Sequence, residues 1–176
     1  MDMYREHGFT LVEMVITIVI AAIALAIATP SMLGMVASNN ATNEANRIIS
    51  SLSLARSEAI KRNMAVNVGS KGSGTDWSDG WQVYSDADSP ASGNTNYSAA
   101  QDVLVEDADE VADGVTISVA PSQNWIAYGG SGFLMESGLA SIDIWVCADI
   151  NGNTAQRHIT ISRSGRPSVD DAGGGC

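Results

Sequence analysis

Residues 9–29 form an apolar run that limits what the N-terminal part of this chain can fold into. Glu13 is the one ionisable residue among these 21 residues. A helix needs about 20 apolar residues to cross the hydrocarbon core of a membrane. A secretory signal peptide is the alternative, but its apolar part is usually only about 7–15 residues long. The run therefore predicts a membrane-spanning helix over residues 9–30, with a carboxylate near its start, where burial in lipid is costly.

The charge of the chain limits which partners it can bind. Before the apolar run stands the short polar segment MDMYREHG, in which Arg5 is the only Lys or Arg. The formal net charge of the whole chain is -11, and ten of the twenty acidic residues lie between Asp76 and Asp113. Such a charge repels phosphate backbones and anionic lipid headgroups. Nucleic-acid binding would therefore need a local basic patch.

After Pro30, apolar residues recur at steps of three and four, which indicates one buried stripe on a helix over residues 31–63. The stripe consists of Ala41, Ala45, Ile48, Ile49, Leu52, Ala55 and Ala59. Pro30 and Gly34 weaken the helical hydrogen-bond ladder between the two halves of the helix, so we expect a helix break there. Two interpretations stay open, an ordinary kink or a helix that partly melts where it leaves the membrane.

From residue 64 onward the apolar period changes from helical to alternating. The segments with the pattern of strands are 64–68, 81–86, 102–107, 114–121, 125–129, 142–149 and 157–163. Loops rich in Gly, Ser, Asn and Asp separate them, with the two longest over 69–80 and 86–102. Because no helices stand between the strands, the pattern predicts an α+β fold with an antiparallel sheet in residues 64–176.

The segment HGFTLVEMVITIVIAAIALAIATP resembles the N-terminus of type IV prepilins and type II secretion pseudopilins. The matching features are the Gly8–Phe9 junction, Glu13 at the fifth position after it, and Pro30 at the twenty-second. This resemblance implies that prepilin peptidase cleaves after Gly8, removing residues 1–8 as a leader, and that Phe9 is N-methylated. It also implies that the helix packs into a filament core, where Glu13 neutralises a terminal amine and makes the buried charge tolerable.

Two further segments narrow the resemblance to the FimT/FimU and GspH group of minor pilins and pseudopilins. These are LARSEAIKRNMAVNV followed by DGWQVYSD, and the ending VCADINGNTAQRHITISRSGRPSVDDAGGGC. The resemblance implies a pilin-like fold, in which the long N-terminal helix packs on a C-terminal antiparallel sheet. It also implies a single-pass protein of the bacterial inner membrane with a periplasmic C-terminal domain, which later enters a pilus or pseudopilus. The implied partners are other pilins or pseudopilins and the inner-membrane assembly platform.

Cys147 and the C-terminal Cys176 are the only cysteines, and their spacing suggests neither a zinc site nor a thioredoxin-like site. Two unrelated thiols are one interpretation, and a disulfide in an oxidising compartment is the other. Because the resemblance places the sheet domain in the periplasm, we expect a disulfide. It would fasten the Gly-rich tail to the strand that contains Cys147.

Arg157, Arg163 and Arg166 form, with His158, the only basic cluster in the second half of the chain. Strand alternation places Arg157 and Arg163 on one face. In the DNA-binding FimT branch, the C-terminal loop resembles Gly-Arg-x-Arg. Here Gly165 and Arg166 fit that pattern, but Ser168 replaces the second arginine. This departure and the acidic net charge favour a solvated turn over DNA contact.

No combination of residues indicates an enzyme, a cofactor or a metal. The only histidines are His7 and His158, so a Ser-His-Asp or Cys-His set is not credible. The segment DINGN, residues 149–153, resembles a calcium loop only weakly, and its Asn-Gly pair better predicts a tight hairpin turn. Among the tryptophans, Trp81 and Trp145 are expected in the core, whereas the loop-bordering Trp77 and Trp125 are candidates for exposure.

Together these features predict a minor pilin of the FimU/FimT type that takes part in the initiation, assembly or tip complex of type IV pili. A GspH-like pseudopilin of type II secretion is one alternative. A minor pilin that binds DNA for natural transformation, through the arginines named above, is the other. The residues alone do not separate a pilus subunit from a secretion subunit.

Overall fold

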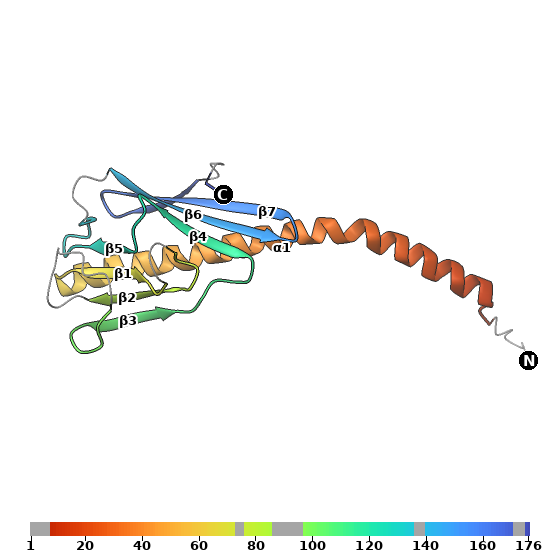
Figure 1. Cartoon of the computed structure of the whole chain (residues 1–176), viewed down its shortest axis with the longest axis horizontal. Coiled ribbons are helices and arrows are strands. Elements are labelled where there is room, and N and C mark those ends of the chain that lie inside the picture. The colour runs from red at the N-terminus through yellow and green to blue at the C-terminus, as the bar shows by residue number, and fades with distance from the viewer. Residues whose placement is uncertain (1–7, 73–75, 86–96, 136–139, 171–174) are drawn as a thin grey trace, which may run out of the picture.

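A single helix, α1 (Leu11–Arg62), forms the first part of the fold, and its N-terminal half extends well beyond the sheets (Figure 1). The computed structural model describes residues 8–72, 76–85, 97–135, 140–170 and 175–176. The leader predicted over residues 1–8 lies outside this range except for Gly8. The backbone of α1 is helical through Pro30 and Gly34, so this structure contains no helix break. Partial melting within a filament stays a prediction.

The C-terminal half of α1 buries a stripe of mostly small side chains. The buried members are Ala37, Ala41, Ala45, Ile48, Leu52, Ala55 and Ala59. The predicted stripe is confirmed except at Ile49, which is only partly buried. Alanine side chains let the helix backbone lie close to the strands, so that the surrounding core is filled from the sheets. The helix ends at Asn63, whose left-handed φ of 53° lets its N–H bond to the carbonyls of Ala59 and Ile60.

In the part of the chain that the structure describes, eight strands form two antiparallel sheets of four strands each beside α1 (Figure 1). The first sheet has the order β3-β2-β1-β5, with β3 (Val103–Ala108), β2 (Trp81–Ser85), β1 (Val66–Ser70) and β5 (Trp125–Tyr128). The second has the order β4-β6-β7-β8, with β4 (Val115–Ala120), β6 (Ser141–Ile150), β7 (Asn153–Ser162) and β8 (Pro167–Asp170). The predicted α+β fold and the seven predicted strands are confirmed. The short edge strand β8 and the division into two sheets were not predicted.

The predicted core position of Trp81 is confirmed, whereas Trp77 and Trp145 are placed differently from the prediction. Trp77 and Trp81 are both 0% exposed, and the indole Nε1 of Trp77 donates to the carbonyl of Gln123 at 3.0 Å. The expected exposure of Trp77 is therefore wrong, because its polar atom finds a backbone partner inside the core. Trp145 lies outside the core, since the alternation of β6 turns it to the outer face of the second sheet. Trp125 is half-buried.

The loop between β6 and β7 is the predicted tight hairpin turn. Its two central residues, Asn151 and Gly152, have positive φ angles of 52° and 81°. Two successive positive φ angles are typical of the type I′ turn, which matches the twist of the flanking strands. A carboxylate oxygen of Asp149 accepts the N–H of Gly152 at 2.8 Å. The turn thus uses the carboxylate that a calcium loop would have offered to the ion.

Gly80 and Gly152 provide a matched test of backbone packing. Both have positive φ, at 92° and 81°, but a Cβ atom at Gly80 would collide with the carbonyl of Ala108, whereas Gly152 faces open space. We expect Gly80→Ala to lower the free energy of unfolding by about 2–3 kcal/mol, and Gly152→Ala by only about 1 kcal/mol. Denaturant unfolding of the full chain in detergent, followed by tryptophan fluorescence, measures both. Equal losses would contradict the role of the Ala108 carbonyl.

Candidate functional site

The N-terminal half of α1 leaves its apolar side chains uncovered. The exposed residues include Leu11, Val15, Ile18, Ile23 and Leu25. Within the described part of the chain, α1 is the one helix that is long and apolar enough to cross a membrane. An apolar surface of this extent is rare on a soluble monomer. The segment therefore needs lipid or another protein around it.

Gly8, Phe9 and Glu13 lie at the free end of this helix. Thr10 is the N-cap residue, and its Oγ1 accepts the N–H of Glu13 at 3.3 Å. A carboxylate in the first helical turn is favourable because it faces the positive end of the helix dipole. Among the described residues, none forms an ion pair with Glu13. Its carboxylate is therefore available to a positive group. The Thr-x-x-Glu spacing of Thr10 and Glu13 is also a signal for the start of a helix, and the prediction from the sequence did not use it.

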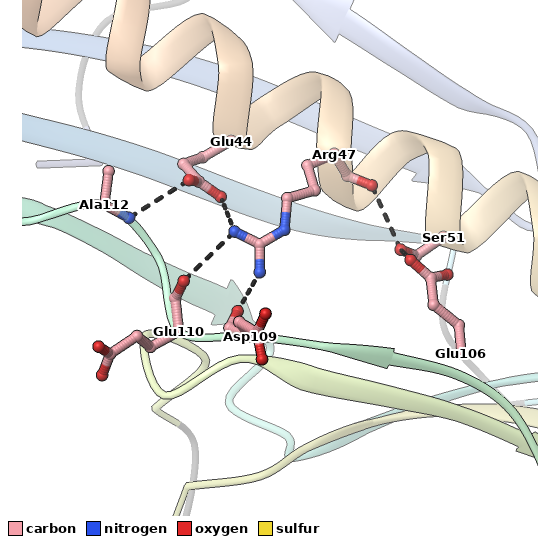
Figure 2. A network of polar contacts seen from close by, with 7 residues as sticks. All are labelled: Glu44, Arg47, Ser51, Glu106, Asp109, Glu110 and Ala112. Carbon is pink, nitrogen blue, oxygen red and sulfur yellow. Dashed lines mark hydrogen bonds and ion pairs between the residues drawn. The ribbon is translucent and has the colours of Figure 1, made fainter.

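A polar network ties the middle of α1 to the loop between β3 and β4 (Figure 2). Arg47 Nη1 donates to Glu44 Oε2 at 2.8 Å and to the carbonyl of Glu110 at 3.3 Å. Arg47 Nη2 donates to the carbonyl of Asp109, and the other oxygen of Glu44 accepts the N–H of Ala112 at 3.2 Å. We call these five residues the helix–loop clamp. It fixes the start of the second sheet against the helix.

Two further contacts extend the clamp toward the first sheet. The guanidinium of Arg47 lies 4.7 Å from the ring centroid of Trp81, which is a favourable cation–π distance. One turn further along α1, Ser51 Oγ donates to Glu106 Oε1 at 3.0 Å (Figure 2). The sequence analysis missed this network. The spacing of Glu44 and Arg47 was the available signal, since residues three apart on a helix are neighbours.

The structure does not bring the three predicted arginines together. Arg157 lies on β7 and faces α1, where its Nη2 donates to Ser38 Oγ at 3.2 Å. Arg163 and Arg166 lie in the turn between β7 and β8, and both are exposed. The six residue steps of extended chain from Arg157 to Arg163 span about 20 Å. The prediction that Arg157 and Arg163 share one strand face is wrong, because β7 ends at Ser162 and Arg163 lies in the following turn.

The outer face of the second sheet holds a second polar cluster. The ring of His158 stacks on Trp145 at a centroid distance of 3.9 Å, and its Nε2 is 2.9 Å from Asp143 Oδ1. Thr160 Oγ1 donates to the same carboxylate oxygen at 2.9 Å. These contacts explain how a tryptophan is accommodated outside the core. On the neighbouring strand β8, Asp170 is the register partner of His158.

The predicted disulfide between Cys147 and Cys176 is confirmed. It holds Gly175 directly against the ring of Trp145, where no larger residue fits. A groove of about 850 Å³ lies beside the disulfide and is lined by β4, β6, β7 and the tail. Thr116, Ser118, Thr154 and Gln156 contribute hydroxyl and amide groups to its lining. The disulfide thus holds Gly175 and Cys176 against the outer face of β6, an inner strand of the second sheet.

The comparison with protein families identifies the domain. Residues 44–165 match the model of the family described as type II transport protein GspH. The chain belongs to the GspH family. Residues 3–29 match the prokaryotic N-terminal methylation motif, so both parts of the expected resemblance are confirmed. A search of curated protein sequences gave no significant match.

Two solved structures resemble this GspH-family chain. Both are crystal structures of the type IV minor pilin FimU from Pseudomonas aeruginosa PAO1, in space groups P21 and P65. The first aligns with a TM-score of 0.60 and 17% sequence identity, covering 75% of this chain and 89% of FimU. The second aligns with a TM-score of 0.56 and 17% identity, covering 73% and 91%. At this identity the similarity shows the fold, and it confirms the predicted pilin-like architecture.

The GspH-family match extends from the helix–loop clamp to the turn between β7 and β8. It therefore includes Glu44, Arg47, the first sheet and strands β4, β6 and β7 of the second sheet, and it ends before β8 and Cys176. The family and the fold are those of pilin structural proteins rather than of known enzymes.

Proposed function

We propose that this chain is a minor pilin that takes part in the initiation, assembly or tip complex of type IV pili. The observation that carries the proposal is the uncovered apolar half of α1, which bears the methylation motif and projects from a GspH-family domain. Such a helix is stable in a bilayer, and it is equally stable when similar helices surround it in a filament core. The sheet domain then meets other pilins outside the membrane.

In this proposal the chain begins as a precursor of the bacterial inner membrane, with residues 64–176 in the periplasm. Prepilin peptidase removes residues 1–8, the amine of Phe9 is methylated, and the assembly platform moves residues 9–30 from lipid into the filament. Residues 31–63 continue the helix into the sheet domain. The disulfide is consistent with a periplasmic domain, because disulfides persist in oxidising compartments.

Processing at Gly8 is the first test of the proposal. Gly8 is exposed, and a Cβ atom placed there would meet no atom within 4 Å, so a peptidase can reach the following bond. We expect the mature chain to begin at N-methylated Phe9, and Gly8→Leu to retain the leader. Gly34→Ala is the matched control, since its Cβ atom would meet only a side-chain oxygen at 3.9 Å, and it should be processed normally. Intact-mass measurement of the wild-type chain and of the two variants shows which of them keep residues 1–8. A wild-type chain that keeps these residues would overturn the proposal.

A pseudopilin of type II secretion is the second candidate, favoured by the description of the matching family. Deletion of the gene separates the two functions. Loss of surface pili with normal protein secretion supports the minor pilin, whereas loss of secretion with normal pili supports the pseudopilin.

DNA binding is less favoured, because Arg157 is hydrogen-bonded to Ser38 and lies apart from Arg163 and Arg166. A salt-sensitive mobility shift that is lost in Arg166→Ala would favour it.

A further inference from the structure

The turn between β6 and β7 reaches α1 at the point where the helix leaves the sheets (Figure 1). A Cβ atom placed on Gly34 would lie 3.9 Å from Asn153 Oδ1, so the turn lies directly beside this residue of the helix. Further along α1, Ser38 Oγ accepts a hydrogen bond from Arg157 Nη2 at 3.2 Å, and Ala37 is fully buried. The hairpin is therefore fastened to α1 from Gly34 onward, and its turn marks the end of the projecting helix.

The length of the projecting helix places this turn relative to a bilayer. The carboxylate of Glu13 is costly in hydrocarbon, so before assembly it lies at the level of the lipid headgroups. Residues 14–33 then cross the bilayer, and twenty helical residues are about 30 Å long, which equals the thickness of the hydrocarbon core. The headgroup region adds about 5–7 Å on each side. Gly34 therefore lies in the headgroup layer, together with the turn that adjoins it.

The composition of the turn suits this layer. Asn151 and Gly152 are exposed, and Asn153 is half-buried, with its Nδ2 donating to the carbonyl of Ile150 at 3.3 Å. We call Asn151, Gly152 and Asn153 the hairpin foot. Amide side chains donate to phosphate oxygens and accept from ammonium groups. The foot has neither an ionised nor a large apolar side chain, so it rests among headgroups without entering the hydrocarbon.

Two exposed carboxylates stand beside the foot. Asp149 Oδ1 accepts the N–H of Gly152 at 2.8 Å, and the N–H of Asp149 donates to the carbonyl of Gly114 at 2.8 Å. Asp113 immediately precedes Gly114 and is also exposed. Within the described residues, neither carboxylate forms an ion pair. Negative charge at this level repels anionic headgroups and attracts the ammonium of zwitterionic headgroups.

From this placement we infer that the hairpin foot docks on zwitterionic, ammonium-bearing headgroups of the leaflet that faces the sheet domain. The foot amides bond to the headgroups, and Asp113 and Asp149 attract the ammonium groups. The contact fixes the depth of the precursor in the membrane, and it is lost when the helix leaves lipid for a filament. The inference rests on the proposed function, because it needs residues 9–30 in a bilayer.

A fluorophore on the foot tests the contact. The full-length chain with Gly152→Cys is labelled with a thiol-reactive fluorophore and placed in phosphatidylcholine nanodiscs, in which a few lipids carry a nitroxide quencher on the headgroup. A Cβ atom at Gly152 meets no atom within 4 Å, so the label displaces no neighbour. We expect about half of the fluorescence to be quenched, because the label lies in the headgroup layer. One label per chain, measured by intact mass, verifies that the native disulfide is retained.

Two control sites calibrate the measurement. Ser162→Cys is exposed at the other end of β7, nine residue steps or about 30 Å from Asn153, and its label should be barely quenched. Ile20→Cys lies on the uncovered half of α1, and a nitroxide on the lipid acyl chain should quench its label. The second control shows whether the helix is inserted in the same nanodiscs.

A change of lipid charge tests the choice of headgroup. In phosphatidylglycerol nanodiscs, quenching at the foot should fall at least about twofold, because anionic lipid repels the two carboxylates. Asp113→Asn with Asp149→Asn should restore it, and asparagine at 149 keeps an oxygen for the N–H of Gly152. Asp170→Asn is the matched control, since it removes an exposed carboxylate on β8, and it should restore nothing.

The outcomes separate this inference from the proposed function. Foot quenching no greater than that at Ser162, in nanodiscs where the Ile20 label reports insertion, overturns the inference and leaves the proposed function standing. Equal quenching in zwitterionic and anionic lipid also overturns it. If the Ile20 label reports no insertion, the inference falls together with the membrane stage of the proposed function. If the foot is quenched and follows lipid charge while the chain is absent from sheared filaments, the inference stands and the assembly function fails.

Discussion

Arg47→Ala will lower the free energy of unfolding by about 3 kcal/mol. The substitution leaves Glu44, which is 7% exposed, as a buried carboxylate without its ion-pair partner. It also removes the donor for the carbonyls of Asp109 and Glu110, and the cation above Trp81. Breaking a buried pair by removing one partner costs more than the pair itself contributes, because an uncompensated charge remains. Denaturant unfolding of the full chain in detergent measures the loss.

Two comparisons identify the cause of this loss. Asn46→Ala, on the exposed face of the same helical turn, should change the free energy of unfolding by no more than about 0.5 kcal/mol. Glu44→Gln in the Arg47→Ala background should recover part of the loss, because it removes the unpaired charge. A loss below about 1 kcal/mol in Arg47→Ala, or purely additive effects of the two substitutions, would mean that the clamp is not a coupled unit.

The helix and the strands were predictable because their residues repeat with the period of the element. The alternation of β4 and β6 separates an inner from an outer face, so these strands were found close to their observed bounds. Trp81 was predicted correctly, but Trp145 and Trp77 were not, because the sequence does not say which face of a strand is covered or which loop residue enters the core. Trp145 falls on the outer face and is accommodated by His158 and Gly175, whereas Trp77 enters the core from a loop.

In the candidate site, the residues of a local sequence motif were predictable, whereas the contacts between distant residues were not. Gly8, Phe9 and Glu13 form a local motif with fixed spacing, and the family match covers it. The helix–loop clamp joins residues more than 60 positions apart, and Arg47 binds carbonyls there, which every residue has. Residue type does not reveal which backbone carbonyls act as acceptors, so only the ion pair of Glu44 and Arg47 could have been predicted from the sequence. The hydrogen bond of Arg157 could not be predicted either, because its acceptor Ser38 lies far away in the sequence, on α1.

Glu13→Ala will leave cleavage after Gly8 intact but reduce recovery of the chain in sheared filaments tenfold or more. After cleavage, the amine of Phe9 is a positive charge at the end of an uncovered apolar helix. When this end is buried among other helices, a carboxylate must neutralise the amine, since an unpaired ion in an apolar environment costs several kcal/mol. Immunoblots of the filament and membrane fractions, normalised to total processed chain, measure the ratio.

The competing explanation is that Glu13 only helps the helix to begin, because its N–H bonds to Thr10 Oγ1 and its carboxylate lies in the first turn. Thr10→Ala removes that cap and leaves the carboxylate, and caps of this kind contribute only about 1 kcal/mol. If docking to the amine is the cause, Thr10→Ala enters filaments almost normally, whereas Glu13→Gln, which keeps the shape but loses the charge, fails as Glu13→Ala does. Equal defects in Thr10→Ala and Glu13→Ala would assign Glu13 to helix capping. Normal recovery of Glu13→Gln would show that the amine is neutralised by another group.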